Sequence, residues 1–290
     1  MLSSVTQNRQ SIEFRGGIGT IAADRWRGAA DVEARGTVLM LHGGGQTRHS
    51  WSRAASNLAR SGWTVYTLDA RGHGDSDWAP DGDYRIDALV GDLRGVIEQI
   101  GVQPVVFGAS LGGMTGLIGE GEGPGLTRGL VLVDITPKVE PEGVARIAEF
   151  MRGNPDGFAS LEEVADAVAA YQPHRERPAN IEGLRRNVRE RANGRLYWHW
   201  DPAFTRPGSL ADSPTASHGR MVDAARAITV PTLLVHGGRS DIVSTDGVDE
   251  LLGLIPHAAA VNVSAAGHMV AGDDNAVFVA EVGGFLDTLV

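Results

Sequence analysis

A strand that ends in a G-x-S-x-G turn is the feature that most constrains this chain. The apolar residues 104–107 predict a buried strand, and Gly108, Ser110 and Gly112 follow it directly. A serine on so sharp a turn has a strained backbone, and flanking glycines remove the Cβ atoms that would collide with the nearby chain. We expect a helix to follow and the Ser110 hydroxyl to project from the end of a sheet. A plain glycine- and serine-rich turn is the alternative, and the motifs elsewhere in the sequence distinguish these two interpretations.

A second glycine loop follows an earlier apolar strand. Residues 38–41 are apolar, and His-Gly-Gly-Gly comes next at residues 42–45. Such a loop can turn backbone N–H groups toward a ligand, which is typical of an oxyanion hole. We expect the backbone N–H groups of Gly44 and Leu111 to be the two donors, with Gly45 as the alternative to Gly44. A phosphate-binding loop is disfavoured, because the chain here lacks both G-x-x-x-x-G-K-[ST] and G-x-G-x-x-G.

Two polar groups in the C-terminal part of the chain complete a candidate triad. Asp241 lies just after the apolar run 232–235, and His268 lies in a Gly-His loop after the run 260–263. A serine hydroxyl is a poor nucleophile near neutral pH and needs a base such as an imidazole, whose tautomer a carboxylate can hold. We expect Ser110 as nucleophile, His268 as base and Asp241 as the acid. Asp134, which follows the strand at 130–133, is the rival for the acid, and we expect it to brace a loop instead.

In these motifs the chain resembles α/β-hydrolase-fold proteins, in the group that holds esterases, lactonases, perhydrolases, epoxide hydrolases and haloalkane dehalogenases. The order Ser, Asp, His along the chain is the order of that family. The resemblance implies a mostly parallel, eight-stranded sheet with helices on both faces, a helical cap, and neither a cofactor nor a metal. It also implies that residues 69–76 brace a loop rather than bind a metal. The matching stretches are residues 41–51, 68–76, 108–113, 132–134, 236–241 and 267–268.

Strand and helix patterns alternate along most of the chain, as an α/β sheet requires. The clearest helix covers residues 85–100, where apolar residues recur every three or four positions and Gly101 follows. An opening hairpin is expected at 12–26, strands at 38–41, 63–68, 105–107, 130–133, 232–235 and 260–263, and helices at 51–60 and 277–289.

The alternation stops between residues 137 and 226, where no strand pattern appears. Helical pieces are expected there near 143–151, 161–171 and 181–191. We therefore expect a core domain made of residues 1–136 and 227–290, and a helical cap made of residues 137–226 that lies over the site. Within the cap, Trp198, His199 and Trp200 are candidates for lining the substrate pocket, and packing of the cap onto the core is the alternative for these rings.

Composition excludes several classes of function. A net charge of −10 argues against nucleic acid or an anionic membrane as partner, and the absence of cysteine excludes disulfides and thiolate chemistry. No apolar run resembles a signal peptide or is long enough to span a bilayer, so we expect a cytoplasmic protein. The expected partner is a small ester or lactone, and a homodimer is left open.

The residue at position 110 separates the members of the family. Haloalkane dehalogenases and epoxide hydrolases of this fold use an aspartate nucleophile, whereas Ser110 favours acyl transfer by a Ser-His-Asp triad. We expect hydrolysis of a small carboxylic ester or lactone. A C–C bond hydrolase, a perhydrolase with the same triad and a non-catalytic ligand receptor are the alternatives.

Overall fold

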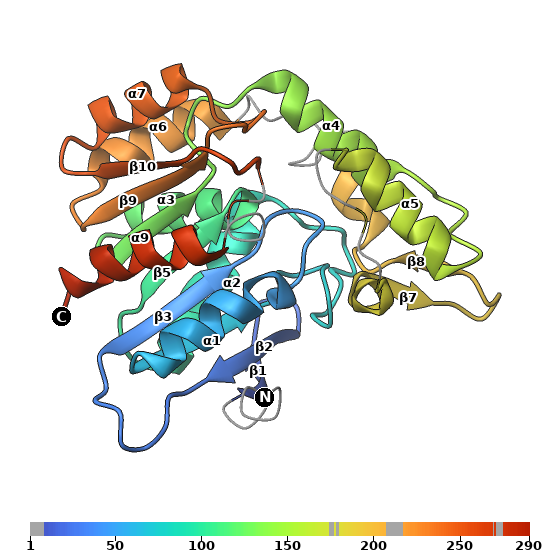
Figure 1. The fold of residues 1–290 in the computed structure, drawn as a ribbon, viewed down its shortest axis with the longest axis horizontal. Coiled ribbons are helices and arrows are strands. Elements are labelled where there is room, and N and C mark those ends of the chain that lie inside the picture. The colour runs from blue at the N-terminus through green and yellow to red at the C-terminus, as the bar shows by residue number, and fades with distance from the viewer. Residues whose placement is uncertain (1–8, 174–176, 178–179, 207–216, 269, 271–274) are drawn as a thin grey trace.

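The computed structural model describes residues 9–173, 177, 180–206, 217–268, 270 and 275–290. Its centre is an eight-stranded sheet with the strand order β1-β2-β4-β3-β5-β6-β9-β10 (Figure 1). The strand β2 (Thr20–Trp26) runs antiparallel to both of its neighbours, β1 (Arg9–Arg15) and β4 (Trp63–Leu68). The remaining neighbours pair in parallel: β3 (Gly36–Leu41), β5 (Val105–Ala109), β6 (Gly129–Val133), β9 (Thr232–Gly237) and β10 (Ala259–Val263). The predicted fold class is confirmed.

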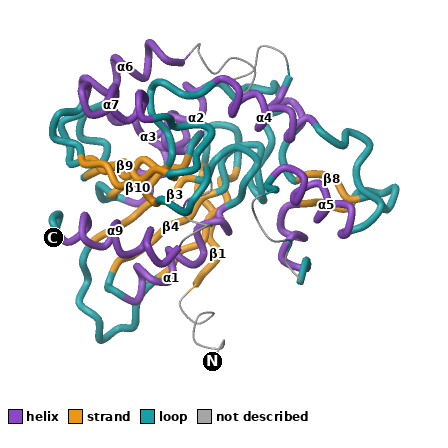
Figure 2. Tube along the Cα trace, turned by 45° about the horizontal axis from the view of Figure 1, so that its top comes forward, coloured by secondary structure: helices purple, strands orange, loops and turns teal. Residues whose placement is uncertain are grey.

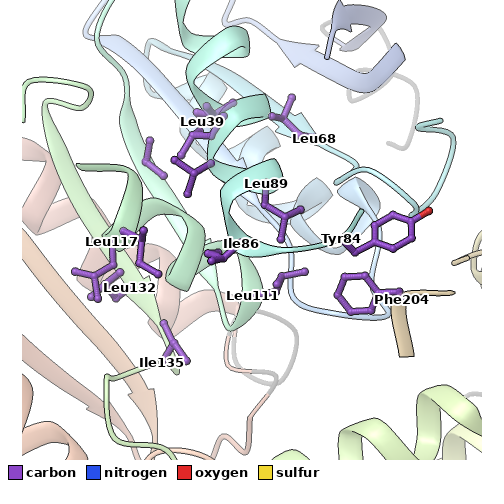
Figure 3. Packing of buried hydrophobic residues seen from close by; sticks show 14 of the residues in the cluster. Leu39, Leu68, Tyr84, Ile86, Leu89, Leu111, Leu117, Leu132, Ile135 and Phe204 are labelled. Carbon is purple, nitrogen blue, oxygen red and sulfur yellow. The ribbon is translucent and has the colours of Figure 1, made fainter. Parts of the chain in front are cut away.

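Helices cover both faces of the sheet and bury two separate apolar layers (Figures 1 and 2). One layer contains side chains of α1 (Ser52–Arg60) and α9 (Asn275–Asp287). The other contains side chains of α2 (Ile86–Ile100), α3 (Leu111–Gly121), α6 (His218–Ala227) and α7 (Thr245–Leu254). Along β3 the side chains alternate, so that Met40 joins the first layer and Leu39 the second, where Figure 3 shows it. Burial on both faces explains why these strands are continuous apolar runs in the sequence.

The topology brings the loops that carry the predicted motifs to one edge. Because β3, β5, β6 and β9 are parallel neighbours, their carboxyl ends meet there, and ligands of open α/β sheets bind outside those ends. The glycine loop at 42–45, Ser110, Asp134 and the turn at 238–241 follow these four strands in turn.

The cap rises over this edge, and its two main helices are those expected. They are α4 (Pro141–Arg152) and α5 (Leu161–Tyr171). The expected helix at 181–191 is wrong: this stretch forms the short 3₁₀ helix η2 (Glu182–Asn187) and the strand β7 (Val188–Glu190). The strand β7 pairs antiparallel with β8 (Leu196–Trp198), whereas the sequence pattern predicts no strand in the cap.

The range expected for the cap ends within a helix. The helix α6 (His218–Ala227) has all but its last residue inside the range 137–226, although it packs against α3 and α7. Residues 174–176, 178–179 and 207–216 of the expected cap lie outside the described residues. Among the helices that are described, none has both the length and the apolar character needed to cross a membrane.

Candidate active site

Ser110 sits alone between β5 and α3, on the strained turn that the sequence predicts. Its φ of 45° and ψ of −110° lie in a sparsely populated region for a residue with a side chain, which typically costs about 1–3 kcal/mol. The flanking glycines are required by close backbone contacts. A Cβ on Gly108 would lie 2.4 Å from the carbonyl group of Gly112, and one on Gly112 would lie 2.5 Å from the carbonyl oxygen of Leu41.

His268 is held by Asp134. The Nδ1 atom of His268 lies 2.6 Å from Oδ2 of Asp134, which is fully buried directly after β6. The same carboxylate accepts a hydrogen bond from the backbone N–H of Gly237 (2.9 Å) and from the hydroxyl of Ser240 (2.5 Å). The end of β9 and the turn after it therefore hold the Asp134 carboxylate in place, and the carboxylate in turn orients the His268 ring.

The expectation that Asp241 pairs with His268 is wrong. Asp241 lies past the turn that follows β9, its side chain is 38% exposed, and it forms an ion pair with Arg146 of α4. Its backbone is also drawn toward the cap, because Gly143 packs against its carbonyl oxygen so closely that a Cβ there would lie 2.1 Å away. Ser240, one residue earlier, is the residue of this turn that reaches the Asp134 carboxylate.

The glycine loop after β3 faces the same cavity as Ser110, Leu111 and His268. Gly45 adopts a φ of 72°, which favours glycine, and its N–H donates to Nε2 of His73 at 3.1 Å. Because the Gly45 N–H is already engaged, the geometry favours Gly44 over Gly45 as the loop's oxyanion donor.

Buried histidines support this loop from below. His42 donates from Nδ1 to the Gly43 carbonyl oxygen (2.8 Å) and accepts at Nε2 from the Ala70 N–H (3.0 Å). Burial is the main cause that lowers the pKa of His42 to about 4 and that of His73 to about 3. Both rings are therefore neutral at neutral pH, so each can donate from one nitrogen and accept at the other.

The stretch 69–76 braces the loops, as the resemblance implies. Asp69, fully buried, accepts hydrogen bonds from the backbone N–H groups of Arg48 (2.6 Å) and Asp75 (2.9 Å), and it also pairs with the Arg48 guanidinium. The hydroxyl of Ser76 donates to the Asp69 carbonyl oxygen at 2.7 Å. These contacts tie the loop after β4 to the start of η1 (Arg48–Trp51).

The cavity above Ser110 is mostly apolar and measures about 220 Å³. Its polar lining includes Ser110, His268, the glycine loop, Gln46, Gln172 and Asn187. The cap closes it with Val144, Ile147, Phe150 and Met151 of α4 together with Trp198 and Trp200. Among the described residues, its lining includes no Asp, Glu, Lys or Arg. A bound substrate would therefore be surrounded mostly by apolar side chains.

The three residues expected to line the pocket divide into two groups. Trp198 and Trp200 line the cavity and stack on each other, with ring centroids 4.9 Å apart and an interplanar angle of 13°. The expectation is wrong for His199, which lies below the cavity against Gly45 and Gly74. Successive side chains of an extended segment point to opposite sides, which explains why position 199 is separated from 198 and 200.

Comparisons with known proteins agree with this architecture. A family model described as the alpha/beta hydrolase fold matches residues 36–274. The chain belongs to this family. It is 33% identical over 279 residues to the esterase Rv0045c of Mycobacterium tuberculosis, covering 93% of this chain and 87% of that protein. It is 30% identical over 267 residues to the sn-1-specific diacylglycerol lipase ABHD11 of Mus musculus, covering 86% and 80%.

Solved structures show the same fold. The M. tuberculosis esterase Rv0045c superposes with a TM-score of 0.76 at 29% identity, covering 97% of this chain and 92% of that chain. The E-2-(acetamidomethylene)succinate hydrolase superposes with a TM-score of 0.81 at 24% identity, covering 96% and 99%, a level that shows the fold alone. The chain is thus a hydrolase of the alpha/beta fold with esterase-like relatives.

Proposed function

We propose that this chain is a serine hydrolase that cleaves a small, uncharged carboxylic ester or lactone. Ser110 would be the nucleophile, His268 the general base and Asp134 the acid that orients it. The observation that carries the proposal is the 2.6 Å hydrogen bond from Nδ1 of His268 to the buried Asp134, at a cavity that Ser110 also lines. This bond leaves Nε2 of His268 as the nitrogen that can accept the serine proton.

The reaction follows from these positions. Ser110 Oγ attacks the acyl carbon while His268 takes its proton, and the tetrahedral oxyanion accepts hydrogen bonds from the N–H groups of Gly44 and Leu111. Each such donor typically contributes about 3–4 kcal/mol to the transition state. The intermediate then expels the alcohol, which receives the proton from His268, and water releases the acyl group by the same steps in a second round.

The cavity supports an uncharged substrate. A charged group would lose its hydration there, and the described lining offers no side chain of opposite charge to compensate. Relatives named as an esterase, as a diacylglycerol lipase and, at 27% identity, as a 3-hydroxybutyrate-oligomer hydrolase support cleavage of an ester. A relative named as a 2-(acetamidomethylene)succinate hydrolase is 26% identical and covers 72% of this chain. Its substrate is a succinate derivative, for which the described cavity holds no cationic partner.

Labelling and burst kinetics test the proposal. A fluorophosphonate should label Ser110 alone, and p-nitrophenyl esters from acetate to octanoate should give a burst of p-nitrophenol as the acyl-enzyme forms. Ser110→Ala should abolish both and lower turnover by a factor on the order of 10⁶, because triad members act as a unit. Its melting temperature should stay close to that of the parent. Labelling at another serine, or a burst that survives in the variant, would overturn the assignment. Binding of esters with no release of p-nitrophenol, either in a burst or at steady state, would identify a ligand receptor instead.

A further inference from the structure

We propose that His199, a cap residue, positions the oxyanion loop, so that the cap sets the geometry of the catalytic donors as well as covering the pocket. This inference rests on the proposed function for its kinetic consequences. Its structural basis is the pair of histidine contacts that hold Gly45 from opposite sides.

Both polar backbone atoms of Gly45 are held by imidazole rings. Its N–H donates to Nε2 of His73 at 3.1 Å, and its carbonyl oxygen lies 3.3 Å from Nε2 of His199. On its other side, His199 accepts a hydrogen bond at Nδ1 from the Gly74 N–H at 2.7 Å. With Nδ1 accepting, a neutral His199 carries its proton on Nε2 and donates it to Gly45.

The state of these rings agrees with this arrangement. His199 is 1% exposed, and burial, followed by the neighbouring rings of His73 and His42, lowers the pKa of His199 well below its usual range. His73 uses its Nδ1 to donate to the Arg71 carbonyl oxygen (3.2 Å), which leaves its Nε2 free to accept from Gly45. Each ring has one donor and one acceptor, and each is used.

The cap segment that carries His199 is anchored to the core. The backbone N–H of Asp201 donates to the Gly72 carbonyl oxygen at 2.8 Å, and the Tyr84 hydroxyl donates to the Asp201 carboxylate at 2.5 Å. Phe204 packs edge-on against His73 with centroids 4.8 Å apart, and it also lies beside Tyr84 (Figure 3). The segment therefore cannot leave the oxyanion loop without breaking the contacts that Asp201 and Phe204 make with the core.

The two contacts of His73 and His199 with Gly45, called the clamp below, restrict a loop that would otherwise be flexible. Three consecutive glycines have many accessible conformations, whereas an oxyanion hole stabilises the transition state only if its donors are already aimed. His199 holds the Gly45 carbonyl oxygen and therefore the peptide plane that joins Gly45 to Gln46. The Gln46 N–H in that plane donates to the Gly43 carbonyl oxygen at 3.1 Å, and the peptide plane of this carbonyl carries the Gly44 N–H. Through this link His199 helps to hold the Gly44 N–H in one direction, which is what a positioning residue would supply.

Two substitutions separate the two hydrogen bonds of His199. In His199→Asn, the side-chain oxygen can replace Nδ1 as acceptor for Gly74, but the donor to Gly45 is lost. In His199→Gln, the amide nitrogen can replace Nε2 and keep the bond to Gly45. His257→Asn is the matched control, because His257 is exposed and, among the described residues, hydrogen-bonds to the Val230 carbonyl oxygen alone.

The expected result is a change in kcat rather than KM. On p-nitrophenyl butyrate, His199→Asn should lower kcat about tenfold with KM within twofold, since the donors act on the transition state. His199→Gln should stay within threefold of the parent, and His257→Asn should match it. Hydrogen exchange should be faster in the peptide covering residues 43–46 in His199→Asn alone.

Several results would overturn the proposal. One is that His199→Asn keeps the kcat of the parent and the same rate of hydrogen exchange in residues 43–46. Another is that His199→Asn raises KM and leaves kcat unchanged, which would make His199 a pocket residue. If His199→Asn does not fold, His199→Gln decides, and a tenfold loss of kcat with parental exchange would refute the clamp. The exchange measurement needs no turnover. It therefore tests the clamp even if no ester is cleaved and the proposed function fails.

Discussion

Substitution of the two candidate acids gives the sharpest test of the triad. In Asp134→Asn, the amide must face donors on both sides: His268 Nδ1 at 2.6 Å and Ser240 Oγ at 2.5 Å near one atom, and the Gly237 N–H at 2.9 Å near the other. Ser240 cannot avoid this by turning its hydroxyl, because its oxygen already accepts from the N–H groups of Ile242 and Val243 at 3.1 Å each.

Both orientations of the new amide are unfavourable. If its oxygen faces His268, its NH₂ group meets the Gly237 N–H and a buried donor loses its partner, which costs about 1–3 kcal/mol of folding stability. If its NH₂ group faces His268, the imidazole must carry its proton on Nε2 and can no longer accept one from Ser110. In serine proteases the corresponding change lowers kcat by about 10⁴, or roughly 5 kcal/mol.

Asp241→Asn is the matched comparison, and it should behave differently. The pair of Asp241 with Arg146 is well exposed, and exposed pairs contribute about 0–1 kcal/mol. Its kcat should stay within a few-fold of the parent. Initial rates on p-nitrophenyl butyrate, normalised by phosphonate titration of active sites, and melting temperatures measure both effects. A larger loss of kcat in Asp241→Asn than in Asp134→Asn would refute the assignment of the acid.

Two further predictions concern the cap and the buried histidines. Trp198→Ala should enlarge the cavity and shift preference toward esters with longer acyl chains, by about 1–3 kcal/mol per methylene, with little change in kcat on p-nitrophenyl acetate. Trp200→Phe should mainly lower the melting temperature, because it removes the hydrogen bond from the indole to the Met151 carbonyl oxygen (3.2 Å). Equal losses of activity on every ester in Trp198→Ala would contradict the first prediction. Burial lowers the pKa of His73 from 6.5 to about 3, so between these pH values the unfolded chain binds a proton that the folded chain does not. As the pH decreases below 6.5, the free energy of unfolding should therefore decrease by up to about 1.4 kcal/mol per pH unit. Urea midpoints at pH 7 and pH 5 should show a smaller fall in His73→Asn, and an unchanged slope would contradict the prediction.

The parts of the fold and site that depend on local sequence were predictable. The sharp turn at Ser110 needs glycines because backbone segments pass too close to positions 108 and 112 to leave room for a Cβ. The G-x-S-x-G motif shows this requirement directly in the sequence. The sheet could be inferred because buried parallel strands are short apolar runs. The cap hairpin also has a local signal in the sequence. Asn193 and Gly194 lie between the strands, Gly194 has a φ of 73°, and an Asn-Gly pair between strands is typical of a hairpin turn.

Which aspartate pairs with His268 was not predictable, because two aspartates satisfy the same sequence rule. Asp134 and Asp241 follow β6 and β9, which are parallel neighbours, so both reach the edge of the sheet where His268 lies. Contacts with residues far away in the sequence distinguish the two aspartates. The backbone N–H of Glu140 donates to the Ile242 carbonyl oxygen at 2.9 Å, and Arg146 of α4 pairs with Asp241, so the cap holds the turn after β9 outward. An acid at 241 would have to turn inward and give up these contacts, displacing the Ser240 hydroxyl from Asp134. The pairing of His268 with Asp134 and the attachment of the cap to the turn after β9 therefore depend on each other. Both rest on contacts between segments about a hundred residues apart.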